Sequence, residues 1–428
     1  MALAHNSNDI FNKVLEIGRP PNIRKLFPNS RALIVSGKVI DRAMLRKGHA
    51  MTIAANGRSS IVIRGTLKAA QRANAAVIIE IAKSEADYCL INMWNLAQYV
   101  DAYCNELGIT VPVAVHADHF GLKKPVEVDK AKIDIPSMID AGITSIAIDA
   151  SHMSEEENLF ANIALSSFIP KWAGYETEVG EIKGKAGLST PEEALFLIRG
   201  LNAHDIFPDW IALNNGTTHG IEESDAGIQV DLTREIHEAL AKYGISGAQH
   251  GTSGNSVERL KRIASETRTT KANVATALQM ISWGVKVNQY GNAILDESGN
   301  FIKLRGEGVT EDLWHEMVSY ANDKSLKKGD YKKLNLPFEK RILAQPKEIR
   351  ERMEKGVEDF AYDLLAKYFN ASDTAPLAME AILEAGSCEL GPKAKRIENP
   401  AEWTREKILE KAAKLHKEEK GPKGNYED

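Results

Sequence analysis

The sequence predicts a (β/α)8 barrel with an N-terminal lead-in and a C-terminal helical extension. Short β-rich runs recur about every 35 residues, and each gives way to a longer stretch whose apolar residues have helical spacing. Eight strand-then-helix units with nearly continuous apolar strands fit a closed parallel sheet of roughly 250 residues. The eight runs cover residues 50–56, 75–82, 111–118, 145–151, 175–180, 210–215, 245–251 and 284–290.

A doubly wound open sheet is the alternative, and the positions of the polar residues favour the barrel. In a (β/α)8 barrel the C-terminal ends of the strands carry the active site. Polar side chains gather at these ends of the runs, at Asn56, Asp118, His119, Ser151, Glu178, Asn215, His250 and Asn288. We therefore divide the chain into a lead-in (1–48), a catalytic barrel (49–310) and a helical extension (311–428).

The composition of the chain argues against nucleic acid and membranes as binding partners. The 428 residues are 43% hydrophobic with a net charge of −5, which gives no electrostatic indication of nucleic-acid binding. Three cysteines without C-x-x-C spacing indicate reduced thiols in a cytosolic protein. Because the sequence has neither signal-peptide character nor an apolar run of 18 residues, we expect a cytoplasmic protein without a membrane partner.

Three histidines follow separate predicted strands: His119, His219 and His250. A lone histidine of this kind is more often a hydrogen-bonded structural imidazole. Three imidazoles that converge at one barrel mouth, however, are the pattern of a catalytic Zn²⁺ site with an open position. Such a site also accepts Co²⁺, Mn²⁺ or Fe²⁺.

Two carboxylates and two glycine clusters accompany the histidines. Glu176 and Glu178 alternate along one run, so they share one face of a strand, either lumen or outside. Glycines at 220 and within 251–254 can bring backbone amides close to an anion, in the loops where such barrels often bind phosphate. The second cluster, HGTSGNS, is alternatively a simple turn with a helix cap.

Seven of these segments, in the same order, resemble the class II, zinc-dependent fructose-1,6-bisphosphate aldolase family between about residues 44 and 290. They are AAN (54–56), HADH (116–119), IDASHMSEEEN (148–158), ETEVGEIKGK (176–185), NNGTTHG (214–220), HGTSG (250–254) and GVKVN (284–288). The resemblance implies that His119, His219 and His250 bind zinc, and that Glu178 is an acid able to bind the ion in an alternative position. It also implies a homodimer or homotetramer with a sugar-phosphate substrate.

The same resemblance assigns the remaining roles. Asp118 resembles the acid that protonates the aldehyde oxygen during condensation. The substrate-binding residues would be Asn288, similar to the amide that holds the enediolate, with Asn56, Gly220, Gly251 and Ser253. The expected reaction is reversible cleavage of fructose 1,6-bisphosphate to dihydroxyacetone phosphate and glyceraldehyde 3-phosphate, in glycolysis and gluconeogenesis.

Three departures from the family pattern leave the substrate open. Ala186 stands where the family has the glutamate that moves the enediolate proton, and Glu181 is the replacement that we consider. Glu223 stands where a lysine contacts phosphate, and Tyr290 and Gly291 where an Asp-Thr pair follows the asparagine. Two alternatives follow: an aldolase with another substrate, which need not be a bisphosphate, or a non-catalytic partner subunit, which should show degraded metal ligands.

Overall fold

The computed structural model contains the expected closed parallel barrel. It describes residues 2–180, 187–216, 227–252, 255–288, 291–385 and 390–418. Each barrel strand pairs in parallel with its neighbours, and β9 pairs back with β2 to close the sheet. The strands are β2 (Thr52–Asn56), β3 (Val77–Ala82), β4 (Val113–Gly121), β5 (Ser145–Asp149), β6 (Gly174–Val179), β7 (Trp210–Leu213), β8 (Ser246–Gln249) and β9 (Thr269–Val274).

Seven predicted strands coincide with β2 to β8, whereas the eighth prediction is wrong. The closing strand is β9, which comes before the predicted run at 284–290. That run instead enters an antiparallel excursion, with bridges from Val285 to Lys303 and from Val287 to Ala293. The sequence of β9, TTKANV, lacks an apolar pattern because its alternate side chains face a polar lumen.

Helices surround the barrel, and several begin at side-chain caps. The Ser59, Ser154, Thr190 and Ser256 hydroxyls each accept a backbone N–H in the first turn of the next helix, which stabilises the helix start. The helices are α4 (Ser60–Ala73), α5 (Leu96–Leu107), α6 (Glu127–Asp140), α7 (Glu155–Ser166), α8 (Pro191–Ala203), α9 (Val230–Ala239), α10 (Val257–Glu266) and α11 (Thr276–Ser282).

The lead-in seals the N-terminal end of the barrel. It contains α1 (Ala2–Gly18), α2 (Pro21–Leu26), β1 (Ile34–Val35) and α3 (Gly37–Lys47). On α3, Lys38 forms an ion pair with Asp209 at 3.3 Å, and Asp41 accepts a hydrogen bond from Thr270 Oγ1 at 2.7 Å. A Cβ at Gly37 would lie 2.5 Å from Ser145 Oγ, so only glycine permits this approach. A substrate can therefore enter the barrel only from the opposite end, where the strands have their C-termini.

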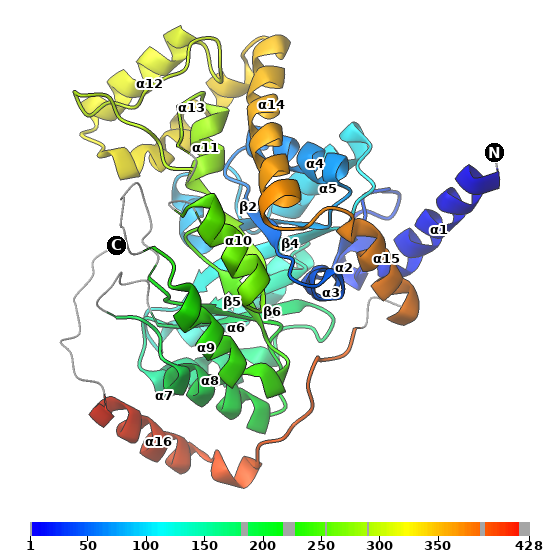
Figure 1. Cartoon of the computed structure of the whole chain (residues 1–428), viewed down its shortest axis with the longest axis vertical. Helices are drawn as coiled ribbons and strands as arrows, with labels where there is room; N and C mark the ends of the chain where they lie inside the picture. The colour runs from blue at the N-terminus through cyan, green and yellow to red at the C-terminus, as the bar shows by residue number, and fades with distance from the viewer. Residues whose placement is uncertain are drawn as a thin grey trace.

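The C-terminal extension packs along the barrel rather than apart from it. It contains α12 (Glu311–Asp323), α13 (Asn335–Leu343), α14 (Lys347–Asp363), α15 (Thr374–Ala385) and α16 (Arg405–Glu418). Helix α14 lies against α4 and α11, α15 against α3, and α16 against α7 and α8 (Figure 1). Since one hydrophobic core runs from the lead-in through the barrel to α15, the domain boundaries at residues 48 and 310 stay a prediction.

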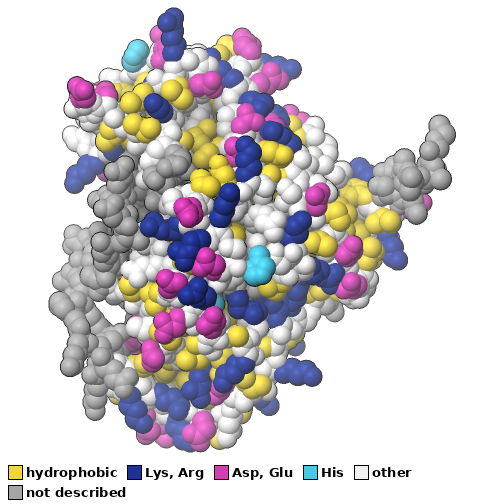
Figure 2. Space-filling view, viewed as in Figure 1, with side chains coloured by type: hydrophobic (Ala, Val, Ile, Leu, Met, Phe, Trp, Pro, Cys, Tyr) yellow, Lys and Arg dark blue, Asp and Glu magenta, His cyan; other side chains and the backbone are white. Residues whose placement is uncertain are grey.

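The surface mixes both signs of charge. On the face drawn in Figure 2, basic and acidic side chains are interspersed over α9, α10 and α14. No helix within the described ranges combines the length and the apolar character that a bilayer span needs.

Candidate active site and metal centre

The half of the barrel lumen near the C-terminal ends of the strands is polar because the strand register aligns polar residues on one face. In a parallel sheet, residues in register point to the same side. Asn56 is in register with Glu80, Glu80 with His116, and Lys271 with Thr52. The lumen therefore holds an unusual density of buried charge, which must be paired or must bind a cation.

A bulge in β4 directs two consecutive residues into this space. Neighbouring strand residues normally point to opposite faces. The register with β5 shifts between Ala117 and Phe120, and His119 has a φ of 40°, in the left-handed region that non-glycine residues seldom adopt. Asp118 and His119 consequently lie on the same side, with His119 Nε2 3.9 Å from Asp118 Oδ2. The bulge therefore lets a buried apolar strand present two polar side chains to the lumen.

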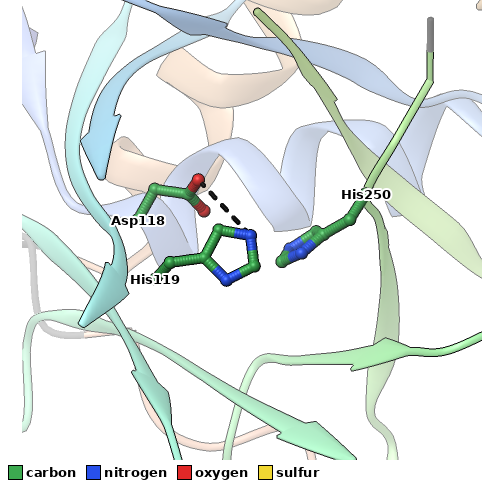
Figure 3. Close-up of side chains that lie close together, drawn as sticks. All are labelled: Asp118, His119 and His250. Carbon is green, nitrogen blue, oxygen red and sulfur yellow. Dashed lines mark ion pairs between the residues drawn. The ribbon is translucent and has the colours of Figure 1, made fainter. Parts of the chain in front are cut away.

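His250 meets His119 from the other side of the mouth. Figure 3 shows Asp118 and His119 on one strand, with the His250 ring facing them. The two imidazole centroids are 4.3 Å apart at an interplanar angle of 72°. His119 is partly open to solvent, with 24% of its side chain exposed, whereas His250 and Asp118 are buried. His119 therefore lies at the solvent-accessible edge of the polar lumen, with His250 and Asp118 behind it.

Glu178 lies between the two histidines. Its Oε1 is 3.1 Å from His119 Nδ1, and its Oε2 is 3.8 Å from His250 Nδ1. Glu176, two residues earlier on the same face of β6, lies 3.0 Å from His250 Nε2. Glu176 and Glu178 therefore face the lumen, the choice that the sequence left open. The two glutamates have different partners there.

The donor set fits a divalent cation. Ligating atoms of Asp118, His119 and His250 lie within 4.8 Å of one another, as do those of Glu176, Glu178 and His250. Ligands about 2.0–2.1 Å from a tetrahedral ion are separated by roughly 3.3 Å, so small side-chain adjustments suffice. Glu176 can hold one nitrogen of His250 while the other faces the ion, the arrangement common around metal-binding histidines.

The charges in the site are strongly coupled. Burial alone would lower the pKa of His119, but the Glu178 and Asp118 carboxylates outweigh it and hold that pKa well above its ordinary value. Burial, reinforced by the Asp149 carboxylate, raises the pKa of Glu178. Burial opposes ionisation of Asp118, yet the positive charges of His119 and Lys271 hold its pKa below the ordinary range. These side chains therefore favour a positive charge between them.

A further candidate group, Glu80, His116 and Asp118, already contains a cation. The Lys271 ammonium lies 3.3 Å from Glu80, 3.1 Å from His116 and 3.5 Å from Asp118. Burial would lower the pKa of Lys271, but the Glu176 and Glu80 carboxylates raise it. A lysine that forms a Schiff base needs a lowered pKa. Lys271 is therefore a fixed charge, and the donors that could hold a metal ion are those around the two histidines.

Several predicted site residues lie outside the described residues: Glu181, His219, Gly220 and Ser253, with the departures Ala186, Glu223 and Tyr290. Gly251, at the end of β8, has a φ of 58° and accepts a hydrogen bond from Asn255. Asn56 is buried at the end of β2, where its amide donates to Glu85 Oε2 at 2.6 Å. The roles assigned to these residues stay predictions.

The placement of Asn288 needs correction. It lies in the excursion after α11, so it is not at the end of a barrel strand. That place belongs to Asn273 on β9, whose amide donates to Asp118 Oδ1 at 2.9 Å. Two and three residues beyond Asn273 stand Ala275 and Thr276, so the threonine of the family pair is present and the aspartate is absent. In the sequence TTKANV, the alternation of Lys271 and Asn273 was the feature that could have indicated a strand with a polar lumen face.

Taken together, the fold and the site define a (β/α)8 barrel whose mouth gathers histidines and carboxylates able to hold a metal ion. Comparison with known families is more specific: residues 38–326 match the model of class II fructose-bisphosphate aldolase. The chain belongs to this family, which makes it an aldehyde-lyase. Members depend on a divalent metal ion and act on sugar phosphates.

Individual relatives are distant. A fructose-bisphosphate aldolase from Streptococcus pneumoniae is 31% identical over 225 residues, covering 50% of this chain and 69% of the relative. One from Staphylococcus epidermidis is 28% identical over 229 residues, covering 50% and 72%. Among solved structures, the Escherichia coli K12 YdjI aldolase superposes with a TM-score of 0.54 at 18% identity, covering 80% of this chain and 99% of that one. The structural likeness supports the fold alone.

Proposed function

We propose that this protein is a zinc-dependent aldolase that reversibly cleaves fructose 1,6-bisphosphate to dihydroxyacetone phosphate and glyceraldehyde 3-phosphate. The observation that carries the proposal is the Asp118 carboxyl beside the donors of His119, His250 and Glu178. Retro-aldol cleavage needs a base next to an electrophilic centre. Asp118 would be the base, and an ion held by the neighbouring donors would supply the electrophile. His219, which follows β7 in the sequence and lies outside the described residues, is proposed as the third histidine ligand.

The bound ion would act as a Lewis acid on the ketose carbonyl. Asp118 takes the proton of the C4 hydroxyl as the C3–C4 bond breaks, which turns C4 into the aldehyde carbon. The electron pair of that bond passes into the C2 carbonyl, and C3 is later protonated to give dihydroxyacetone phosphate. In the direction of condensation, Asp118 returns its proton to the aldehyde oxygen. Glu181 remains our candidate for the proton transfer at C3.

Asn273 has the position that we propose for the amide contacting the substrate oxygens. Its side chain extends from the end of β9 to Asp118, beside the reacting groups. Asn56, Gly220, Gly251 and Ser253 are retained as substrate-binding candidates. The proposed setting is a cytoplasmic homo-oligomer, a dimer or tetramer, which rests on family membership.

A second candidate keeps the chemistry and changes the substrate. Ala275, two residues beyond Asn273, stands where the family pattern has an aspartate. Glu223 replaces a lysine expected to contact phosphate, and a carboxylate would repel that group. These changes favour an aldol substrate other than fructose 1,6-bisphosphate.

One matched pair of variants tests the metal site without requiring the substrate. His250→Ala should purify with far less zinc than wild type after equal metal loading. His237→Ala is the control, because His237 is also buried but lies on α9, away from the site. Unchanged zinc content in His250→Ala, by elemental analysis, would remove His250 from the proposed centre.

A further inference from the structure

Lys271 is the buried ammonium at the centre of the lumen. Its side chain is fully buried. Its Nζ lies 2.8 Å from Glu176 Oε2, 3.1 Å from His116 Nε2 and 3.5 Å from Asp118 Oδ1. An ammonium has three donors, and Glu80 Oε2, 3.3 Å away, is a fourth acceptor around this one. Lys271 is therefore held among acceptors from four side chains.

Two chains of contacts lead from this ammonium to the reacting groups. In the first chain, Lys271 contacts Asp118 directly, and the Asp118 carboxyl is the group proposed to move the substrate proton. Through Glu176, it reaches His250, because Glu176 uses one oxygen for Lys271 and the other for the imidazole. A carboxylate held at both oxygens cannot rotate freely, so the direction of the His250 ring depends on Lys271.

We propose that Lys271 is a positioning residue of this enzyme, which fixes the proton-transferring Asp118 and, through Glu176, the metal-binding His250. The Asp118 half of this inference rests on the proposed function, whereas the His250 half concerns metal binding alone. In this proposal Lys271 acts through these two side chains, whose geometry it sets.

Removing Lys271 alone would leave buried carboxylates without their cation, a change that can prevent folding. A background variant reduces this problem. Glu80→Gln removes one of the carboxylates around the ammonium, so less negative charge is left unpaired when Lys271 is replaced. Glu80 contacts Lys271 at 3.3 Å and has no part in the proposed reaction. Lys271→Met, which keeps the length of the side chain, is then made in this background.

The first readout is zinc affinity, measured on the full-length protein by competition with a chromophoric chelator. Substitution of residues that support a metal-binding histidine weakens affinity 10- to 100-fold. We expect a loss of about tenfold for Glu80→Gln/Lys271→Met relative to Glu80→Gln, because Lys271 acts one residue further out. Equal affinities of the two folded proteins would overturn the His250 half of the proposal. This readout is valid whatever the substrate is.

The second readout is a double-mutant cycle in kcat with Asp118→Asn, in the same Glu80→Gln background. If Lys271 acts through Asp118, Lys271→Met should lower kcat at least tenfold when Asp118 is present, with KM changed less than threefold. It should have less than a threefold effect once Asp118 is replaced. Equal losses in both backgrounds would overturn the Asp118 half. Failure of wild type to cleave fructose 1,6-bisphosphate would instead contradict the proposed substrate and leave the zinc readout to decide.

Discussion

Replacing Asp118 separates proton transfer from metal binding. Asp118 is 3% exposed, and its Oδ1 is held by Asn273 at 2.9 Å. In Asp118→Ala the ammonium of Lys271 keeps Glu176 as a partner at 2.8 Å, so the buried charge stays paired and the variant should fold. His119, His250 and Glu178 are unchanged, so the zinc content should equal that of wild type.

The expected loss is in turnover. A positioned general acid or base contributes 10²- to 10⁴-fold, which corresponds to about 2.7–5.4 kcal/mol of barrier. We therefore expect kcat of Asp118→Ala to fall by this factor while KM stays within about threefold, since Asp118 acts on the C4 hydroxyl in the reaction step. Release of dihydroxyacetone phosphate coupled to NADH oxidation gives both constants.

Glu80→Gln is the matched control, because Glu80 is also a buried acid of the lumen. Its kcat should stay within threefold of wild type. If Asp118→Ala, loaded with zinc, retains kcat within threefold, Asp118 does not move the proton and the mechanism above is wrong.

Three further predictions concern other parts of the molecule. Glu176→Gln removes the charge that holds His250, so zinc affinity should weaken 10- to 100-fold by chelator competition; unchanged affinity would exclude this support. Burial raises the pKa of Glu339 to about 7, so its contribution to stability is present below pH 4.5 and is lost as pH rises to 7. Glu339→Gln should therefore stabilise the protein by up to about 3 kcal/mol at pH 8 and by almost nothing at pH 4.5 in denaturant titrations. Equal effects at both pH values would refute that reasoning. Lys393→Met breaks the buried pair with Asp41, 2.6 Å away at the sealed end of the barrel, and should cost about 3–5 kcal/mol with kcat of the folded protein unchanged; a loss of kcat at full zinc loading would contradict the separation of that end from the site.

The sequence predicted the fold well because five of the seven strands that it located are largely apolar and end in polar residues. Such runs, separated by amphipathic stretches, are typical of strands covered on both faces. The eighth strand escaped prediction because its sequence, TTKANV, has Lys271 and Asn273 on the lumen face and contains no apolar run. The more β-rich 284–290 segment was chosen in its place.

The candidate site was predictable in part for the same reason. His119, His250 and Glu178 follow or end recognisable strands, and the structure brings these three together. The support from Glu176, Lys271 and Asn273 depends on register between strands far apart in sequence. No spacing within one segment predicts that Lys271 on β9 reaches Glu176 on β6.

The most direct test of the central claim measures triose phosphate release from fructose 1,6-bisphosphate by the full-length protein, before chelation, after chelation and after zinc is added back. The account predicts cleavage at an ordinary enzymatic rate, on the order of 1–10³ s⁻¹, which chelation abolishes and zinc restores. Cleavage that persists in protein shown to be free of metal would contradict the metal-dependent mechanism. Absence of cleavage by protein shown to hold zinc would contradict the proposed substrate and favour another aldol substrate.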